Sequence, residues 1–168
     1  ITVVTEHRAV LDPCEMVEQQ GGRVTYLSVQ PDGFVDVDEL DRAVRPDTIL
    51  ITVMTVNNEI GVIQPIADIS KVAQAHGVPL HTDAAQALGK TPVEVGQLGV
   101  DFLSMSAHKM YGPKGVGALY IRSGNRRTAL DPLIYGGGHE QGLRSGTLNV
   151  AGIVGFGCAA ELCSKEFM

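Results

Sequence analysis

Residues 48–55 read TILITVMT, and this stretch decides the fold class. Almost every side chain in it is apolar or β-branched, which is typical of a strand buried on both faces in a parallel sheet. The segment that follows begins with Pro65 and ends at Gly77, and its apolar residues recur at helical spacing. Residues 78–83 then predict another strand, so that a strand, a helix and a strand succeed one another.

The same alternation extends in both directions. Asp36 and Glu39 resemble a capping box, with Pro46 just past the end of the helix that they begin. Strands are predicted at 1–5, 24–29, 102–106 and 117–122, and helices at 12–20, at 37–44 and after Asn149. Strands that alternate with helices predict an α/β fold, in which a mostly parallel sheet is flanked by helices. The 168 residues are expected to form one domain.

Composition excludes several classes of protein. The chain has 13 Lys and Arg against 19 Asp and Glu, and its net charge of -6 disfavours direct binding to nucleic acid. The longest uncharged apolar run, 150–160, is shorter than the roughly 18 residues of a membrane-spanning helix, so no membrane binding is expected.

The cysteines and the first residue predict where the chain belongs. Cys14, Cys158 and Cys163 form no CxxC pair, so neither a zinc ribbon nor a disulfide framework is supported. We therefore expect a reducing compartment such as the cytoplasm. The chain begins with Ile1 inside a predicted strand, and we expect it to be a piece of a longer protein.

A single lysine stands out at the end of the fifth predicted strand. Residues 104–117 read SMSAHKMYGPKGVG, and Lys109 directly follows Ser106 and His108. An amine in a partly desolvated site loses its proton more easily and can attack an aldehyde to form a Schiff base. The alternative is a solvated surface lysine.

Asp83 ends the preceding strand, in the stretch LHTDAAQALG of residues 80–89. A buried carboxylate must find a proton or a cation, and a protonated pyridine nitrogen would suit it. Asp with Lys is the pair that a pyridoxal phosphate site requires. Gln86 could then donate a hydrogen bond to the ring oxygen. The alternative for Asp83 is a helix N-cap.

Further polar residues follow strands. His7 could stack on a flat ring or shuttle protons, or be structural. Ser106, His108 and the turn at 144–147 supply donors that suit a phosphate. The histidines lack the spacing of a metal site, so no metal is predicted.

Five segments in order resemble the cysteine desulfurases, which belong to the aminotransferase class V group of pyridoxal-phosphate enzymes. They are TEHRAVLD (5–12), VNNEIGV (56–62), HTDAAQALGK (81–90), SAHKMYGPKGVGALY (106–120) and GGGHEQGLRSGT (136–147). The resemblance implies that residues 1–168 are an incomplete large, cofactor-binding domain of fold type I. The N-terminal segment and the C-terminal small domain of the family are missing.

The resemblance also implies two catalytic residues. Lys109 would hold pyridoxal phosphate as a Schiff base, and His7 would stack on the ring and serve proton transfers. Asp83 would pair with the ring nitrogen and keep the ring able to withdraw electrons.

The remaining site residues implied by the resemblance bind the cofactor. Gln86 and Asn58 would bond the side of the ring that carries the hydroxyl. Ser106 and His108 would hold the phosphate. Thr147 would reach the phosphate of the neighbouring subunit's cofactor, which implies a homodimer.

The family reaction removes sulfur from L-cysteine and gives L-alanine and an enzyme persulfide. The sulfur then passes to an acceptor such as an iron–sulfur scaffold protein, or to thiolation. The family's catalytic cysteine loop is missing here, so this piece alone is predicted to be inactive. Two alternatives stay open: a selenocysteine lyase or other class V enzyme, and a truncated, non-catalytic dimerisation module.

Overall fold

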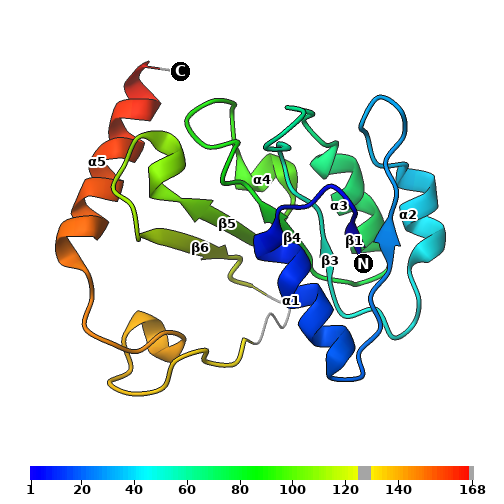
Figure 1. The fold of residues 1–168 in the computed structure, drawn as a ribbon, viewed down its shortest axis with the longest axis horizontal. Helices are drawn as coiled ribbons and strands as arrows, with labels where there is room; N and C mark the ends of the chain where they lie inside the picture. Colours follow the sequence, from blue (N-terminus) through cyan, green and yellow to red (C-terminus); the bar gives the residue numbers. More distant parts are fainter. Residues whose placement is uncertain (125–129, 167–168) are drawn as a thin grey trace.

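The computed structural model describes residues 1–124 and 130–166 (Figure 1). Within these residues the strands form two sheets. β1 (Thr2–Val3) pairs in parallel with β2 (Tyr26–Leu27). The larger sheet has the order β3-β4-β5-β6, with the bounds β3 (Ile51–Thr52), β4 (Leu80–Asp83), β5 (Phe102–Ser106) and β6 (Gly117–Ile121). The Thr52 amide donates to the Ile1 carbonyl at 2.9 Å, so the two sheets are joined through β1 and β3.

Residues 48–55 are predicted to form a buried strand. The burial of its second half is confirmed, but the regular strand is shorter than predicted. Residues 51–55 are all buried, although only Ile51 and Thr52 are regular strand. Beyond them the backbone still follows β4, since the Val53 amide donates to the His81 carbonyl at 3.2 Å and the Thr55 amide to the Asp83 carbonyl at 2.9 Å. The segment therefore forms the centre of the core, as its composition predicts.

β3, β4 and β5 are parallel, whereas β6 runs antiparallel to β5. The predicted sheet is mostly parallel, so this edge strand refines the prediction. The cause is the connection at 107–116, which holds only the short 3-10 helix η1 (Ala107–Met110). A parallel return requires a crossover of about a dozen residues or more, usually a helix. A tight connection therefore reverses the chain.

Helix α1 (Arg8–Gln19) begins four residues before the predicted start at residue 12. The His7 side chain accepts a hydrogen bond from the Ala9 amide at 3.1 Å and caps the helix. Pro13 lies inside the helix rather than at its start. The predicted cap of α2 (Val37–Ala43) is confirmed, because the Asp36 side chain accepts from the Glu39 amide at 3.0 Å.

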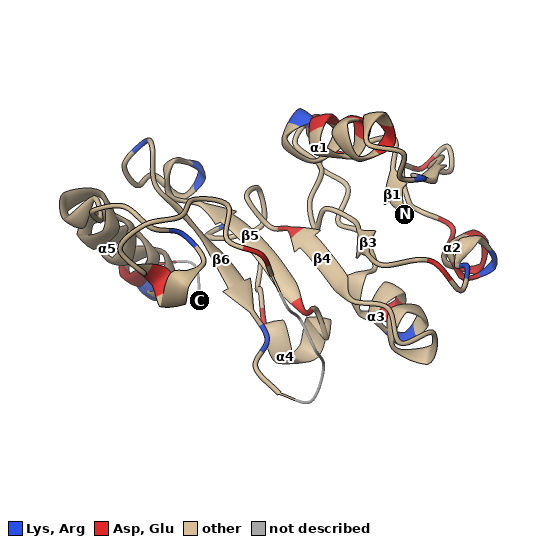
Figure 2. Ribbon diagram, turned by 90° about the horizontal axis from the view of Figure 1, so that it is seen from below, with Lys and Arg blue, Asp and Glu red and all other residues tan. Residues whose placement is uncertain are grey.

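The other helices flank the sheet as expected. α3 (Ile66–Ala75) follows Pro65 and buries Ile66, Ile69 and Ala73. α5 (Val150–Glu166) starts after Asn149, which accepts from the Gly152 amide at 3.1 Å. Figure 2 shows α1 on one side of the sheet, and α3 with the short α4 (Val95–Leu98) on the other. No helix within the described ranges is long and apolar enough to cross a membrane.

The core lies between the sheet and α2 and α3. Its largest fully buried side chains include Leu40, Ile51, Ile69, Leu80 and Leu103. A separate small cluster under α5 consists of Met110, Ala159 and Cys163. The main core thus holds β3, β4 and β5 rigidly side by side, and their carboxyl ends form one edge.

Candidate active site

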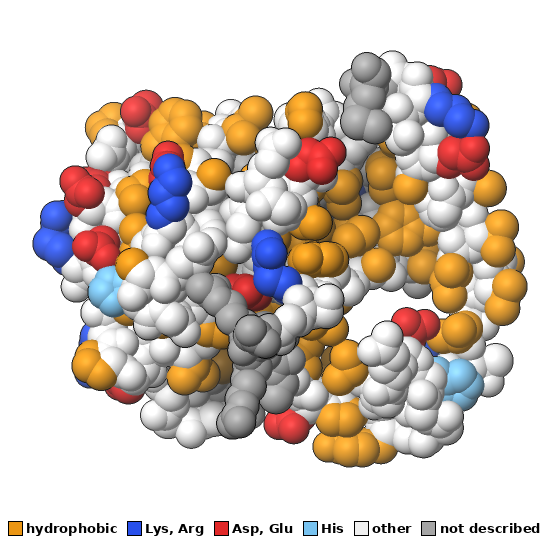
Figure 3. Space-filling view, turned by 180° about the vertical axis from the view of Figure 1, so that it is seen from behind, with side chains coloured by type: hydrophobic (Ala, Val, Ile, Leu, Met, Phe, Trp, Pro, Cys, Tyr) orange, Lys and Arg blue, Asp and Glu red, His pale blue; other side chains and the backbone are white. Residues whose placement is uncertain are grey.

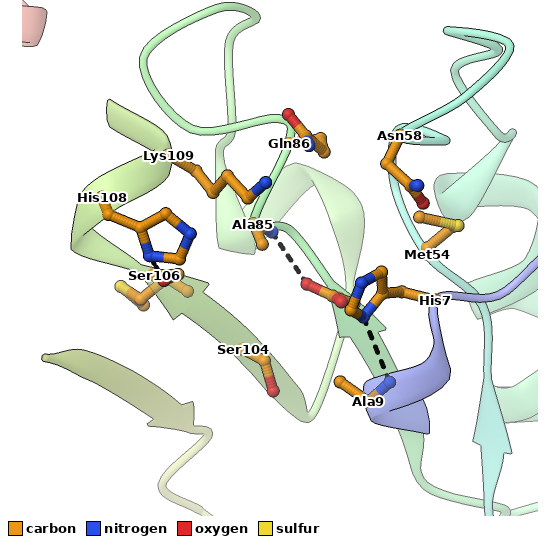
Figure 4. Close-up of a pocket in the computed structure, with 12 residues that line it drawn as sticks. His7, Ala9, Met54, Asn58, Ala85, Gln86, Ser104, Ser106, His108 and Lys109 are labelled. Atoms are coloured by element: carbon orange, nitrogen blue, oxygen red, sulfur yellow. Dashed lines mark hydrogen bonds between the residues drawn. The ribbon is translucent and has the colours of Figure 1, made fainter. Parts of the chain in front are cut away.

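A pocket of about 480 Å³ opens at the carboxyl ends of β4 and β5 (Figure 4). Its size lies in the range of about 300–1,000 Å³ that is usual for small-molecule sites. Seven of the eight predicted site residues line it: His7, Asn58, Asp83, Gln86, Ser106, His108 and Lys109. These residues come from segments as far apart as the β1–α1 turn and η1, so the fold brings together what the sequence keeps separate.

Asp83 is the last residue of β4 and is partly buried. Its Oδ1 accepts a hydrogen bond from the Ala85 amide at 2.8 Å. Residues 85–90 form a turn and not a helix, so the alternative of a helix N-cap is wrong, and Asp83 lines the pocket. A carboxylate has two oxygens, each with two lone pairs. The bond to Ala85 fixes the orientation of the group and leaves acceptor capacity for a cation in the pocket.

Lys109 lies in η1, directly after β5. Figure 4 shows its amine extending over the pocket toward Ala85 and Gln86. Within the described residues this amine makes no hydrogen bond or ion pair. Lys90, by contrast, donates to Gln86 Oε1 at 2.6 Å. Lys109 is thus a lysine whose amine lines the cavity and is not committed to a carboxylate of the same chain.

Two donors stand together at one end of the pocket. Ser106 Oγ and His108 Nδ1 are 2.9 Å apart and hydrogen-bonded. Because the two groups are bonded to each other, a neutral pair has one proton left to donate outward, from either the hydroxyl or Nε2. A hydrogen bond from this pair to an anion is stronger than one to a neutral group. Gln86 lies nearby, and since Lys90 occupies its oxygen, its amide NH₂ is the end that can donate into the pocket.

His7 has the structural role that its sequence left open, as a helix cap, and it also lines the pocket, while stacking on a ring and proton transfer stay predictions. Its Nδ1 accepts from the Ala9 amide, so in the neutral ring the proton lies on Nε2. Figure 4 shows the ring at the pocket wall beside Met54 and Asn58. The helix cap therefore fixes both the ring orientation and the tautomer of a pocket histidine.

Asn57 and Asn58 are neighbours in the chain with different roles. Asn57 is buried and holds the turn: its Nδ2 donates to the Thr5 carbonyl at 2.7 Å, and its Oδ1 accepts from the amides of Glu59 and Ile60 at 2.8 and 2.9 Å. Asn58 is exposed and lines the pocket. The rigid turn at Asn57 thus sets the position of Asn58.

Thr147 is the one predicted site residue that the chain does not bring to the pocket. It is exposed, in a loop held by bonds from the Gly138 amide to Ser145 Oγ at 3.1 Å and from the Gly146 amide to His139 Nδ1 at 3.3 Å. Its action on a neighbouring subunit stays a prediction. Among the described residues no group of three or more His, Cys, Asp or Glu side chains is placed to hold a metal ion.

Sequence reasoning missed Glu6, the residue before His7. It is buried, its Oε1 accepts from the Met54 amide, and its Oε2 has no hydrogen-bond partner among the described residues. Burial raises the pKa of Glu6 to about 8, the bond to Met54 opposes this rise, and the nearby Asp83 adds to it. An acid of this kind is mostly protonated at neutral pH. Nothing in the residue pattern around position 6 indicates that its carboxyl points inward.

The donor set matches the groups of pyridoxal phosphate. The uncommitted Lys109 amine suits the aldehyde, the fixed Asp83 carboxylate suits the ring nitrogen, and the pair Ser106–His108 suits a phosphate. All line a single cavity of sufficient volume. The fold and the pocket together define an α/β enzyme domain whose site opens at the carboxyl ends of parallel strands.

Residues 1–168 match the model of the aminotransferase class-V family, and the chain belongs to that family. The class V aminotransferases and the cysteine desulfurases among them depend on pyridoxal phosphate. The recognition from five motifs and the fold class of the sequence analysis are thereby confirmed.

Curated relatives carry the name of cysteine desulfurase. The chain is 57% identical over 166 residues to the mitochondrial cysteine desulfurase of Arabidopsis thaliana. The alignment covers 99% of this chain and 36% of the relative. It is 55% identical over 166 residues to the cysteine desulfurase IscS of Mannheimia succiniciproducens, covering 99% of the chain and 41% of the relative. The chain thus spans about two fifths of the length of the curated relatives that it matches.

Solved structures share the fold over nearly the whole chain. A structure described as SspA in complex with cysteine has a TM-score of 0.89 and 48% identity, and covers 95% of this chain and 46% of its own. A NifS-like protein has a TM-score of 0.92 and 43% identity, and covers 98% of this chain and 45% of its own.

Proposed function

We propose that the chain is the incomplete cofactor-binding large domain of a cysteine desulfurase, the enzyme that takes sulfur from L-cysteine and leaves L-alanine. The observation that carries the proposal is the arrangement of Asp83, at the end of β4, and Lys109, in η1 after β5, which line one pocket. The names of the relatives support the choice of reaction, and the structure described as holding cysteine supports the choice of substrate.

When bound, pyridoxal phosphate supplies an aldehyde that captures amines and a ring that withdraws electrons from the substrate carbon next to the amine. The residues of this chain bind and orient it. The Lys109 amine would hold the cofactor at its aldehyde. The Asp83 carboxylate would keep a proton on the ring nitrogen, because a nearby negative charge favours the protonated form.

Further residues of the chain fix the position of the ring. The hydrogen-bonded pair Ser106–His108 would hold the phosphate at one end, and the Gln86 amide would donate to the ring oxygen at the other side. Asn58 binds beside it. His7 would cover the ring and take or return a proton, while its cap on α1 keeps its imidazole in place. Holding the reacting atoms in one geometry accounts for much of the rate gain in such sites.

We do not assign the role of the family's catalytic thiolate to Cys14, Cys158 or Cys163, since none of them lines the pocket. The nucleophile that accepts the sulfur comes from the rest of the protein. The sulfur would pass from there to an acceptor such as an iron–sulfur scaffold protein. We also propose a cytoplasmic protein, while noting that some relatives are mitochondrial in name.

A homodimer completes the proposal. Thr147 is exposed and lies outside the pocket of its own chain, which supports its use in the site of a second copy. The exposed apolar side chains of α5, among them Val150 and Val154, support a covered surface near this loop.

The test uses the full-length protein that contains this chain. The wild type is expected to show the visible absorption of covalently held pyridoxal phosphate and to form alanine from L-cysteine. Lys109→Ala is expected to lose both, whereas Lys114→Ala, a control at an exposed lysine outside the pocket, keeps both. Absence of the absorption band in the wild type would favour the non-catalytic dimerisation module. A preference for selenocysteine, measured by selenide release, would favour the lyase.

A further inference from the structure

A line of hydrogen-bonded side chains crosses three parallel strands below the pocket. Thr52 Oγ1 on β3 and His81 Nδ1 on β4 are 2.7 Å apart, and His81 Nε2 and Ser104 Oγ on β5 are 2.8 Å apart. Ser104 lines the pocket. We call these three residues the hydroxyl–imidazole relay.

The register of the sheet places the relay beside Asp83. Thr52 is the partner of His81, and Ser104 is the partner of Asp83. Because alternate residues of a strand share a face, His81 and Asp83 point to the same side of β4. The relay therefore ends on β5, directly opposite Asp83 on β4. Neighbouring strands of a sheet lie about 4.8 Å apart.

The imidazole of the relay is neutral near pH 7. Burial lowers the pKa of His81, and the nearby Asp83 carboxylate only partly offsets this effect. A neutral imidazole has one donor and one acceptor nitrogen. The relay therefore has a direction, and the two hydroxyls at its ends must play opposite roles.

The direction follows from the burial of Thr52. Its hydroxyl is buried and, among the described residues, has no hydrogen-bond partner except His81. If Thr52 only accepted, its own proton would be buried without an acceptor, which is costly. Thr52 is thus the donor to Nδ1, and Nε2–H donates to Ser104 Oγ. The Ser104 proton is then free to point into the pocket.

We propose that the relay positions the Ser104 hydroxyl as a hydrogen-bond donor at the pocket wall, on the strand next to Asp83. A donor held in one direction supports the side of the pocket that would hold the cofactor ring. The proposal rests on the proposed function, because it concerns the wall of the cofactor pocket. It makes Thr52, His81 and Ser104 positioning residues.

The first test needs no cofactor. Nitrogen NMR of full-length, cofactor-free protein with ¹⁵N-labelled histidine, assigned with His81→Gln, reports the tautomer of His81. A neutral ring with its proton on Nε2 at pH 7 is expected, and the Nε2 resonance is expected to shift in Ser104→Ala. A proton on Nδ1, or a doubly protonated ring, overturns the proposed direction.

The second test measures the dissociation constant of pyridoxal phosphate by equilibrium dialysis. Ser104→Ala and His81→Gln are each expected to weaken binding about fivefold, which corresponds to one ordinary hydrogen bond. The double variant is expected to be no more than about tenfold weaker, because the two residues act as one unit. Ser104→Thr, which keeps the hydroxyl, is expected to bind within about twofold of the wild type.

A matched control separates the relay from general loss of a buried serine. Ser70 is buried and donates to the Gly99 carbonyl at 3.0 Å, outside the pocket. Ser70→Ala is expected to leave the dissociation constant unchanged. Wild-type binding by Ser104→Ala, or single effects that multiply in the double variant, overturns the proposal. If the wild type itself binds no cofactor, the proposed function fails, and the NMR result still decides the relay.

Discussion

The two parts of the chain on either side of residues 125–129 differ in how they use their apolar side chains. In residues 1–124, large apolar residues such as Leu40, Leu80 and Leu103 are at most 1% exposed. In residues 130–166, Leu133 is 87% exposed and Val154 59%. Figure 3 shows apolar side chains gathered around a hollow near α5. The first part carries its own core, and the second presents the kind of surface that another polypeptide covers.

Substitutions in the two parts provide the sharpest test of this difference. Leu103→Ala removes a buried side chain from the centre of the sheet and is expected to lower the free energy of unfolding by about 3 kcal/mol. Leu133→Ala changes a side chain that is 87% exposed in this chain, and a loss within about 0.5 kcal/mol is expected where no second copy covers it. Urea unfolding of the full-length protein measures both. Equal losses would show that residues 130–166 are as well packed as the sheet.

The buried Glu6 predicts a pH dependence that belongs to the first part alone. Its pKa is about 8 in the folded protein and near 4.5 when exposed, so the folded state holds a proton that the unfolded state releases. The stabilisation is complete below pH 4.5 and is lost as the pH rises toward 8, by up to about 1.4 kcal/mol per pH unit.

Glu6→Gln keeps an acceptor for the Met54 amide and cannot ionise. From pH 5 to pH 8, the unfolding free energy of the wild type is therefore expected to fall steadily relative to that of this variant. Other titrating groups, such as the histidines, contribute equally to both proteins and cancel. A pH-independent difference would mean that Glu6 is charged in the folded protein.

The smallest effect concerns the contact between two copies. Thr147→Ala in the full-length protein is expected to weaken cofactor binding about fivefold, which corresponds to the loss of one ordinary hydrogen bond. Mixing Lys109→Ala and Thr147→Ala protomers, with denaturation and refolding to exchange subunits, tests the assignment. If Thr147 acts across the interface, each mixed dimer has one intact site, and tight cofactor binding returns to part of the sample. No recovery would place Thr147 in the site of its own chain.

Much of the fold followed from local patterns. Helix caps at Asp36 and Asn149, and the boundaries Pro65 and Gly77, depend on residues within one or two turns, so the sequence predicts them well. The direction of β6 and the early start of α1 were predicted less well. The first depends on the length of the 107–116 connection, and the second on a histidine cap, a side chain less usual in that role than Ser or Asp.

The candidate site divides in the same way. Lys109, Asp83 and Gln86 could be chosen from their types and their places after predicted strands. Glu6 and Ser104 could not, because their importance comes from burial beside residues that are distant in sequence. His81 is one of the histidines whose spacing does not fit a metal site, and the structure shows that it joins Thr52 to Ser104 across the sheet. Such cross-strand contacts depend on register.

The sequence by itself determined the order of strands and helices, the family, and the residue types able to hold an aldehyde, a ring nitrogen and a phosphate. These features depend on hydrophobic periodicity and short motifs, which are local. Only the tertiary structure decided that the amine and the carboxylate share one cavity, that a buried acid stands behind it, and which face of each strand meets its neighbour. Those features arise when parallel strands align, since register converts distances along the chain into contacts across the sheet.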